Sequence, residues 1–425
     1  MFRIGTKTKL VLGAVGFYAS AEAYLHWSTQ QIINSRKLSI SSQEKFKSET
    51  VAGMFINPFP EYRPQTGFEF MLVRFIELFE SFYGNKIELH EHPDKDHTVE
   101  DYLQIHKPNI DIFTQNSKIL QECIKNDNFK AIKSSWWSTP INKQLLCIWL
   151  GQSCSLIQIS GINFLTDPIL SDHLFSPHIG PRRLNSSPMD LKDLQNATNN
   201  QLNFILVSHD HPDHLEMDLV KQIGNKSTWI VPLGLKKTLA RKGIYNIIEM
   251  DWWESIKLNP YIKGGDKLDD YEIVCLPSMH WSGRWIVDAN FSLWCSFIIK
   301  QNGKSIVYHA GDTGYSKELF EEIGRVHAPV HLSLLPIGQY CPSWHQKPRH
   351  ISPEESLKIV DHLKSSFMFG VHWGTYKLSS EPILEPKKLL TKLSKDREKT
   401  EYFKTPEFGL TYLFDIDKNI QYPIY

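Results

Sequence analysis

The sequence predicts a layered α/β domain that occupies the C-terminal two thirds of the chain. Short apolar runs rich in β-branched and aromatic residues follow one another from Gln144 onward, separated by polar or glycine-containing turns, as in strands. Helical stretches intervene, for example at residues 216–223 and 353–363, and strands that return after helices imply α/β layers. With 41% hydrophobic and 22% charged residues among 425, the composition is that of an ordinary globular protein. We therefore predict one domain over residues 144–425.

Residues 1–45 are predicted to be a leader or membrane anchor. The apolar run LVLGAVGFYASAEAYL, residues 10–25, is flanked by positive charge, and Glu22 is the only acid in residues 1–43. This run is shorter than the roughly 20 apolar residues of a spanning helix. A basic, acid-poor leader fits a mitochondrial presequence or a short anchor, whereas a secretory signal gains no support from the cysteines. The expected location is the mitochondrion, at its inner membrane, with another intracellular membrane as the alternative.

Residues 46–143 form a predicted N-terminal extension. The segment INPFP, residues 56–60, precedes an apolar run at 68–79 that fits a helix, and residues 84–130 are interpreted as helix and loop. Within them, residues 90–97 (HEHPDKDH) superficially resemble a metal motif. They lack an Asp-His pair at the required spacing, so a solvated loop is the better interpretation.

Charge and cysteine content exclude several classes of function. The chain has 47 basic and 47 acidic residues, a net charge of zero, and we expect no nucleic-acid partner because nucleic-acid-binding domains usually carry a basic surface. The six cysteines form no Cys-x-x-Cys pair, which excludes a common thiolate zinc pattern, and they are expected to be free buried thiols.

A cluster of histidines and acids directly after the apolar run FILV indicates a metal site. Leaving Asp210 aside, the hexapeptide His209-Asp210-His211-Pro212-Asp213-His214 holds three imidazoles and one carboxylate, Asp213, at chelating spacing. A strand ending here would place His209 and His211 on the same side, because side chains two residues apart face the same way. A turn would then present Asp213 and His214 from a second direction. Imidazole and carboxylate together suit zinc and similar metals; the alternative is a polar, His-rich surface turn.

The pattern His-x-His-x-Asp-His resembles the signature of the metallo-β-lactamase superfamily. That resemblance implies an αββα sandwich whose loops hold two metals, here two Zn²⁺. The family needs three further ligands, and the chain offers each of them after a strand-like run. They are His280 after EIVCLPSM, Asp312 in HAGDTGY and His372 in FMFGVHWGTY.

Further segments narrow the resemblance to one branch of that superfamily. They are INPFP, WLGQSCSLIQI, FLTDPI, GPRR, VPLGL, EMDWWE, AGDTGY, LPIGQY, SPEES and VHWGTY. Over residues 50–390 they look like the phospholipases D that hydrolyse N-acyl-phosphatidylethanolamine. The resemblance implies a membrane phospholipid as substrate, with phosphatidic acid and an N-acylethanolamine as products. Animal members are peripheral membrane dimers, so membrane association and, by analogy, a homodimer are expected.

The resemblance also assigns the ligands. His209, His211 and His280 would hold one zinc; Asp213, His214 and His372 would hold the other; Asp312 would bridge both. A hydroxide belongs between the metals, since two metals lower the pKa of bound water and clamp the attacking and leaving oxygens of a phosphoryl displacement. The expected catalytic residues are Asp213, Asp312 and His350.

Four more residues have open roles. Asp167 either orients a ligand imidazole or caps backbone N–H groups at a strand end. Tyr340, Arg349 and His350 either bind the lipid phosphate or protonate the leaving oxygen, or belong to a surface loop. Ser352 is expected to cap a helix that starts at Pro353.

The chain departs from the family pattern at two positions. Gln152 stands where many members have a histidine; the position is outside the seven ligands, so metal binding should survive while the supporting role changes. Pro212 replaces an aromatic residue of the animal enzymes, which stiffens the turn and removes a substrate contact.

Two other functions compete with the lipid phosphodiesterase. A soluble lactonase or another metal-dependent hydrolase of the superfamily would keep the metal site and change the substrate, because fold does not fix function. A non-catalytic, metal-bound tethering protein is disfavoured because all seven presumptive ligands are present.

Overall fold

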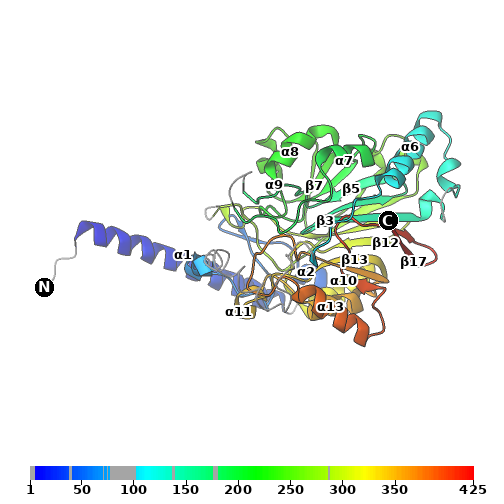
Figure 1. Cartoon of the computed structure of the whole chain (residues 1–425). Helices are drawn as coiled ribbons and strands as arrows, with labels where there is room; N and C mark the ends of the chain where they lie inside the picture. The colour runs from blue at the N-terminus through cyan, green and yellow to red at the C-terminus, as the bar shows by residue number, and fades with distance from the viewer. Residues whose placement is uncertain are drawn as a thin grey trace.

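Two β-sheets packed face to face form the centre of the molecule, with helices on both outer faces (Figure 1). The computed structural model describes residues 5–37, 41–69, 71–73, 75–76, 102–135, 139–175, 180–285 and 288–425. Within these residues the predicted αββα layering is confirmed. The segment at 90–97 lies outside the described residues, so the loop interpretation stays a prediction.

The first sheet has eight strands in the order β17–β16–β3–β4–β5–β6–β7–β8. Their bounds are β3 Gln144–Gly151, β4 Cys154–Ile159, β5 Ile162–Thr166, β6 Phe204–Leu206, β7 Thr228–Pro232, β8 Ile247–Met250, β16 Thr411–Asp415 and β17 Ile420–Ile424. Strands β5, β6, β7 and β8 run parallel, so their carboxyl ends share one edge of the sheet.

The second sheet has seven strands in the order β15–β14–β13–β12–β11–β10–β9. Their bounds are β9 Ser255–Lys257, β10 Tyr271–Leu276, β11 Ser296–Gln301, β12 Lys304–His309, β13 Val330–Pro336, β14 Phe367–Val371 and β15 Phe403–Lys404. Strands β12, β13 and β14 are parallel. Strand β10 has the same direction as β12, because each pairs antiparallel with β11.

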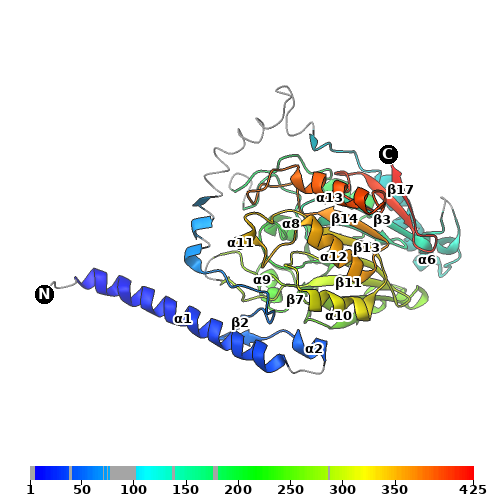
Figure 2. The same cartoon turned by 90° about the horizontal axis from the view of Figure 1, so that it is seen from below.

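Helices cover the outer face of each sheet (Figures 1 and 2). Against the first sheet lie α6 Ile110–Asn126, α7 Leu191–Ala197, α8 Met217–Ile223 and α9 Leu235–Ala240. Against the second lie α10 Lys317–His327, α12 Pro353–Leu363 and α13 Glu385–Asp396, and the short α11 Ser343–Gln346 precedes α12. Short 3-10 turns complete the chain at Ala131–Lys133, Ile141–Lys143, Gly224–Lys226, Asn259–Tyr261 and Gly265–Lys267.

The side chains of strand β3 alternate between two hydrophobic cores, one between the sheets and one under the outer helices. All eight of its residues are buried. Its odd-numbered Leu145, Cys147 and Trp149 join the cluster between the sheets, whereas Leu146, Ile148 and Leu150 join the cluster under the helices. Side chains of a strand alternate between its faces, so a strand covered on both sides is apolar throughout. All six cysteines are free thiols, as predicted; five are buried and Cys341 is partly exposed.

The N-terminal helix α1, Thr6–Arg36, extends away from the body of the molecule (Figures 1 and 2). Its C-terminal end contacts the body, where Arg36 Nη1 donates to the carbonyl of Lys47 at 2.8 Å. After it come α2 Ser42–Lys45 and a hairpin of β1 Thr50–Val51 and β2 Met54–Phe55. Residues 67–69, 71–73 and 75–76 are helical, which agrees with the helix predicted there. Of the helices that the structure describes, none is both long and apolar enough to span a bilayer.

Candidate metal centre

Loops after strands of both sheets deliver the predicted metal ligands to one place. The hexapeptide at 209–214 follows β6, and Asp167 follows its neighbour β5. From the second sheet, His280 follows β10, Asp312 follows β12 and His372 follows β14. Because each of these strands ends at the same edge of its sheet, residues distant in sequence meet there.

Three imidazoles form the first group of donors. His209, His211 and His280 are all buried and their candidate ligand atoms lie within 4.8 Å of one another. His211 Nδ1 lies 2.8 Å from His209 Nε2 and 3.2 Å from His280 Nε2. The structure therefore brings together the trio that the sequence assigned to one metal.

The second group contains two imidazoles and two carboxylates. Asp213, His214, Asp312 and His372 are buried and offer ligand atoms within 4.8 Å of one another. His214 Nε2 lies 3.2 Å from His372 Nε2 and 3.2 Å from Asp312 Oδ2. Asp213 Oδ2 lies 3.4 Å from His372 Nε2.

Asp312 and His350 connect the two groups. Asp312 Oδ2 is 3.7 Å from His280 Nε2 of the first group, and Asp312 Oδ1 is 3.1 Å from His372 Nε2 of the second. Asp312 therefore lies between the two groups, and its role as a bridging ligand stays a prediction. His350 Nδ1 is 3.7 Å from Asp312 Oδ2, and His280, Asp312 and His350 form a third cluster of possible donors.

Burial and neighbouring charge set the protonation of these groups. Burial, together with the neighbouring histidines, lowers the pKa of His209 and His211 well below the usual value, and burial lowers the pKa of His280 to about 4. Burial alone would raise the pKa of Asp312, but His372 and His214 hold it well below its ordinary range. At neutral pH the first group is thus uncharged imidazole and Asp312 is a carboxylate, the forms that bind metals.

The donor set fits a pair of divalent cations. In the first group the lone pairs of uncharged imidazoles face one another and repel, and a cation between them removes that repulsion. In the second group burial opposes a charge, but Asp312 and Asp213 raise the pKa of His214 well above its usual value and that of His372 to about 9. A cation there would take the place of the protons on these two imidazoles. Asp312 Oδ1 and His350 Nδ1 are buried without a hydrogen-bond partner, so both atoms are available to a cation. Imidazole and carboxylate donors in this ratio match zinc, with other first-row metals as alternatives.

Asp167 has both of the roles that the sequence left open: it orients a ligand imidazole and it caps a backbone N–H group at a strand end. Its Oδ1 accepts the backbone N–H of Ser208 at 2.7 Å, and its Oδ2 lies 2.8 Å from His214 Nδ1. The same Oδ2 lies 2.9 Å from His309 Nε2, a residue that the sequence analysis did not single out. A carboxylate on the far nitrogen of a ligand imidazole fixes the ring's orientation and tautomer. The sequence signal for His309 was its place as the last residue of β12, three residues before Asp312.

The N-terminal extension contacts the ligand His280. The sequence did not predict this contact. Asn57 Nδ2 donates to the His280 carbonyl at 2.6 Å, and His280 Nδ1 lies 2.9 Å from the Arg349 carbonyl. The guanidinium of Arg349 in turn donates to the Arg63 carbonyl at 3.4 Å. Its side chain is therefore engaged with the extension, while its backbone orients a ligand.

Tyr340 is engaged away from the donor groups. Its hydroxyl donates to Glu385 Oε1 at 2.6 Å, and burial, followed by that carboxylate, raises its pKa far above the usual value. The role of a proton donor at the metals gains no support from this contact.

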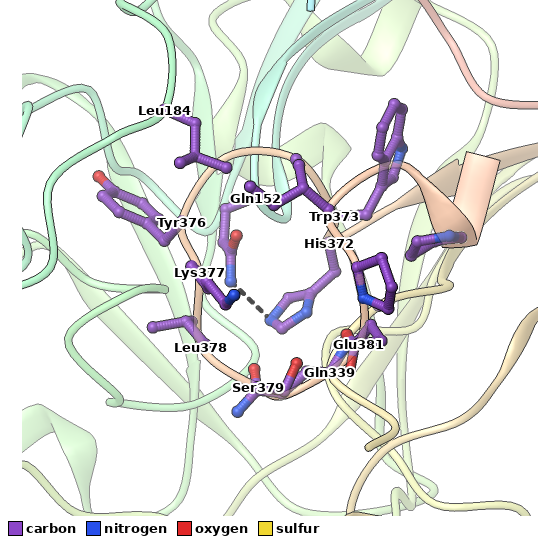
Figure 3. Close-up of a pocket in the computed structure, with 15 residues that line it drawn as sticks. Gln152, Leu184, Gln339, His372, Trp373, Tyr376, Lys377, Leu378, Ser379 and Glu381 are labelled. Atoms are coloured by element: carbon purple, nitrogen blue, oxygen red, sulfur yellow. Dashed lines mark hydrogen bonds between the residues drawn. The ribbon is translucent and has the colours of Figure 1, made fainter. Parts of the chain in front are cut away.

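A small pocket opens beside the second group (Figure 3). Its volume is about 30 Å³, which is room for roughly two water molecules. Gln152 and His372 lie on one side of it, joined by a contact of 2.9 Å between their Nε2 atoms, and Gln339 and Glu381 lie at another edge. The lining is Gln152, Leu184, Gly338, Gln339, His372, Trp373, Gly374, Tyr376, Lys377, Leu378, Ser379, Glu381, Pro382, Ile383 and Pro386.

The fold and the cluster define a protein of the metallo-β-lactamase superfamily. A family model described as "Beta-lactamase superfamily domain" matches residues 162–373. The archaeal metallo hydrolase Igni18 from Ignicoccus hospitalis is similar at 22% identity and a TM-score of 0.48, over 64% of this chain and 98% of that one.

Two named relatives narrow the class. The chain is 39% identical to the "N-acyl-phosphatidylethanolamine-hydrolyzing phospholipase D, mitochondrial" of Saccharomyces cerevisiae, over 87% of this chain and 78% of that protein. It is 37% identical to the "N-acyl-phosphatidylethanolamine-hydrolyzing phospholipase D 1" of Caenorhabditis elegans, over 62% of this chain and 74% of that protein. The chain therefore belongs to the N-acyl-phosphatidylethanolamine-hydrolysing phospholipase D family of metal-dependent hydrolases.

Proposed function

We propose that the protein hydrolyses N-acyl-phosphatidylethanolamine at a centre of two zinc ions. The observation that carries the proposal is the convergence of seven buried donors from four separate loops into two groups joined by Asp312. The named activity of the two relatives supplies the substrate class. Water adds to phosphorus, the bond from phosphorus to the ethanolamine oxygen breaks, and the products are phosphatidic acid and an N-acylethanolamine.

The residues have separate tasks in this reaction. When bound, the two metal ions lower the pKa of water and neutralise charge on the phosphate oxygens. Asp213 and Asp312 supply carboxylates, and Asp167 holds His214 in place from the opposite nitrogen. His350 keeps Nδ1 without a hydrogen-bond partner next to Asp312, and burial lowers its pKa well below the usual value. It is therefore an uncharged imidazole at neutral pH, and we assign it a hydrogen bond to the substrate, while the leaving ethanolamine oxygen takes up the proton that the attacking water gives up.

Helix α1 supports a position at a membrane surface. Its first half exposes large apolar side chains, among them Leu10 at 70% and Phe17 at 78% exposure, and it carries Lys7 and Lys9. Apolar side chains beside basic ones favour the interface of an anionic bilayer. The name of the yeast relative and the basic leader support the mitochondrion, and we place the protein at its inner membrane. The homodimer stays a prediction.

A comparison of two substrates tests the function. Purified protein is incubated with N-acyl-phosphatidylethanolamine in mixed micelles and, separately, with generic lactones, and the products are identified by mass spectrometry. We expect phosphatidic acid and N-acylethanolamine from the first and no turnover of the second. Turnover of the lactone alone would establish the soluble hydrolase instead.

Asp312→Asn tests whether this cluster carries the reaction. The variant keeps the shape of the side chain but loses the charge that links the two donor groups. Replacing a residue that merely supports a ligand typically costs 10- to 100-fold in metal affinity or activity, so a shared ligand should cost more than about 100-fold. Asp396→Asn, at an exposed site at the end of α13, is the control, and equal turnover in both variants would place the active site elsewhere.

A further inference from the structure

The turn between β3 and β4 carries a buried glutamine into the metal centre. Gln152 is 1% exposed and has a positive φ of 48°, a conformation that is uncommon outside glycine and often found at functional sites. Its backbone N–H donates to Thr375 Oγ1 at 2.6 Å, and its carbonyl accepts the backbone N–H of His372 at 2.9 Å. The loop that holds a metal ligand therefore also fixes Gln152.

The amide end of Gln152 lies as close to the ligand atoms as they lie to one another. Its Nε2 is 2.8 Å from Asp213 Oδ2 and 2.9 Å from His372 Nε2, and those two atoms are 3.4 Å apart. Within the same group, His214 Nε2 and His372 Nε2 are separated by 3.2 Å. Gln152 thus stands among the donors of the second group, as Figure 3 shows for its contact with His372.

A glutamine amide can offer either end at this position. A half-turn about its last torsion exchanges the N–H₂ group for the carbonyl oxygen without changing the shape of the side chain. Next to a carboxylate alone, the N–H end is favourable. Next to a divalent cation the carbonyl oxygen is the favourable end, because the cation attracts the oxygen and repels the N–H dipole, and glutamine carbonyls are known ligands of hard cations.

We propose that Gln152 is an additional ligand of the second metal through its carbonyl oxygen. It would join Asp213, His214, His372 and the bridging Asp312. The inference rests on the proposed two-metal centre, and it adds an eighth protein ligand to the seven assigned from the resemblance.

Two variants of Gln152 separate a ligand from a mere hydrogen-bond donor. Gln152→Met keeps the length of the side chain and removes both polar atoms, and should weaken binding of the second metal about tenfold or more. Gln152→Glu removes the N–H donor but offers a charged oxygen, and should tighten the second metal. If the amide only donates an N–H to Asp213, Gln152→Glu would instead weaken binding, because two carboxylates would face each other.

The measurement is the stepwise dissociation constant of zinc, obtained by competition with a chromophoric chelator, together with metal content per chain. Cobalt-substituted protein supplies a second readout, because its visible absorption reports the ligands directly. Gln195→Met and Gln195→Glu, at an exposed site in α7, are matched controls, and the first dissociation constant should stay constant throughout. Changes in thermal unfolding identify variants that fail to fold.

Each outcome bears on one proposal. A wild-type protein that binds fewer than two ions contradicts the proposed two-metal function itself. A wild-type protein with two ions, and a Gln152→Met variant with unchanged affinity and unchanged cobalt spectrum, overturns this inference alone. Weaker binding in Gln152→Glu than in the wild type overturns it as well, in favour of the hydrogen-bond role.

Discussion

At the scale of single residues, the geometry of the metal centre depends on the ligands and also on the residues that hydrogen-bond to them. Asp167 is fully buried, and His309 and His214 keep its carboxylate ionised, with a pKa of about 2 although burial opposes ionisation. It accepts the backbone N–H of Ser208, directly before His209, and also contacts the far nitrogen of His214. One side chain therefore orients both ends of the hexapeptide.

Asp167→Asn should weaken metal binding by about 10- to 100-fold, the usual cost of removing such a support. The amide retains one acceptor but loses the charge that fixes the His214 tautomer. Metal content after dialysis against a weak chelator measures the effect. Asp172→Asn, exposed and five residues further along, is the control. Equal metal retention in the two variants would contradict the role given to Asp167.

At the scale of elements, the N-terminal extension is fastened to the loop that carries His350. Arg63 donates two hydrogen bonds to Glu69, at 2.6 and 2.7 Å, and His345 Nδ1 lies 2.7 Å from the same carboxylate. Bidentate pairs of this kind are the stronger ion pairs at protein surfaces. Hydrogen bonds from Arg63, followed by that with His345, lower the pKa of Glu69 from 4.5 to about 2.

This shift predicts a pH-dependent stability. Because the folded-state pKa of Glu69 is depressed, its stabilising effect is present above about pH 4.5 and is lost as the pH falls through about 2. Glu69→Gln should therefore lower the melting temperature at pH 7 by roughly 1–2 °C, and the difference from wild type should shrink between pH 4.5 and 2. Glu321→Gln, in an exposed pair with Lys317, should show no such convergence. A difference for Glu69→Gln that is constant with pH would refute the ion pair.

At the scale of the whole molecule, α1 stands apart from the sandwich and exposes apolar surface. The helix extends from the body (Figure 2), and its first half includes Phe17 and Leu12, the latter at 56% exposure. Near its middle, the Tyr18 hydroxyl accepts the backbone N–H of Gly67 at 2.6 Å, which places the helix next to the start of the 67–76 segment. That segment also exposes large side chains, including Phe68 and Met71.

Replacing Leu12 and Phe17 by serine should weaken binding to vesicles. Each side chain contributes about 1.5–3 kcal/mol when fully buried in an apolar phase, so the double variant should lose at least about tenfold in partitioning. Cosedimentation with vesicles that contain anionic lipid measures this loss, while turnover of substrate in mixed micelles should stay close to wild type. Tyr245→Ser, 72% exposed on the body, is the control. Unchanged sedimentation of the double variant would refute the membrane role of α1.

From the sequence alone we could predict the layered fold, several of the strands and the ligand candidates in the hexapeptide at 209–214. Local chemistry suffices for these: β12 coincides with the apolar run KSIVYH, and α12 begins at Pro353 after the cap Ser352. A dense His/Asp motif after a strand indicates a metal site in any fold that can close around it. The order of the later ligands came from the family resemblance, which covers most of the chain.

Which other residues contact those ligands depends on how the two sheets pack. Asn57 is 223 positions from His280, and Gln152 is 61 and 220 positions from Asp213 and His372. A single Asn or Gln in the sequence does not indicate a contact with a metal ligand. Such contacts form only when the strand ends of the two sheets converge. The chain's local pattern fixes where strands end; the packing of the two sheets decides what meets there.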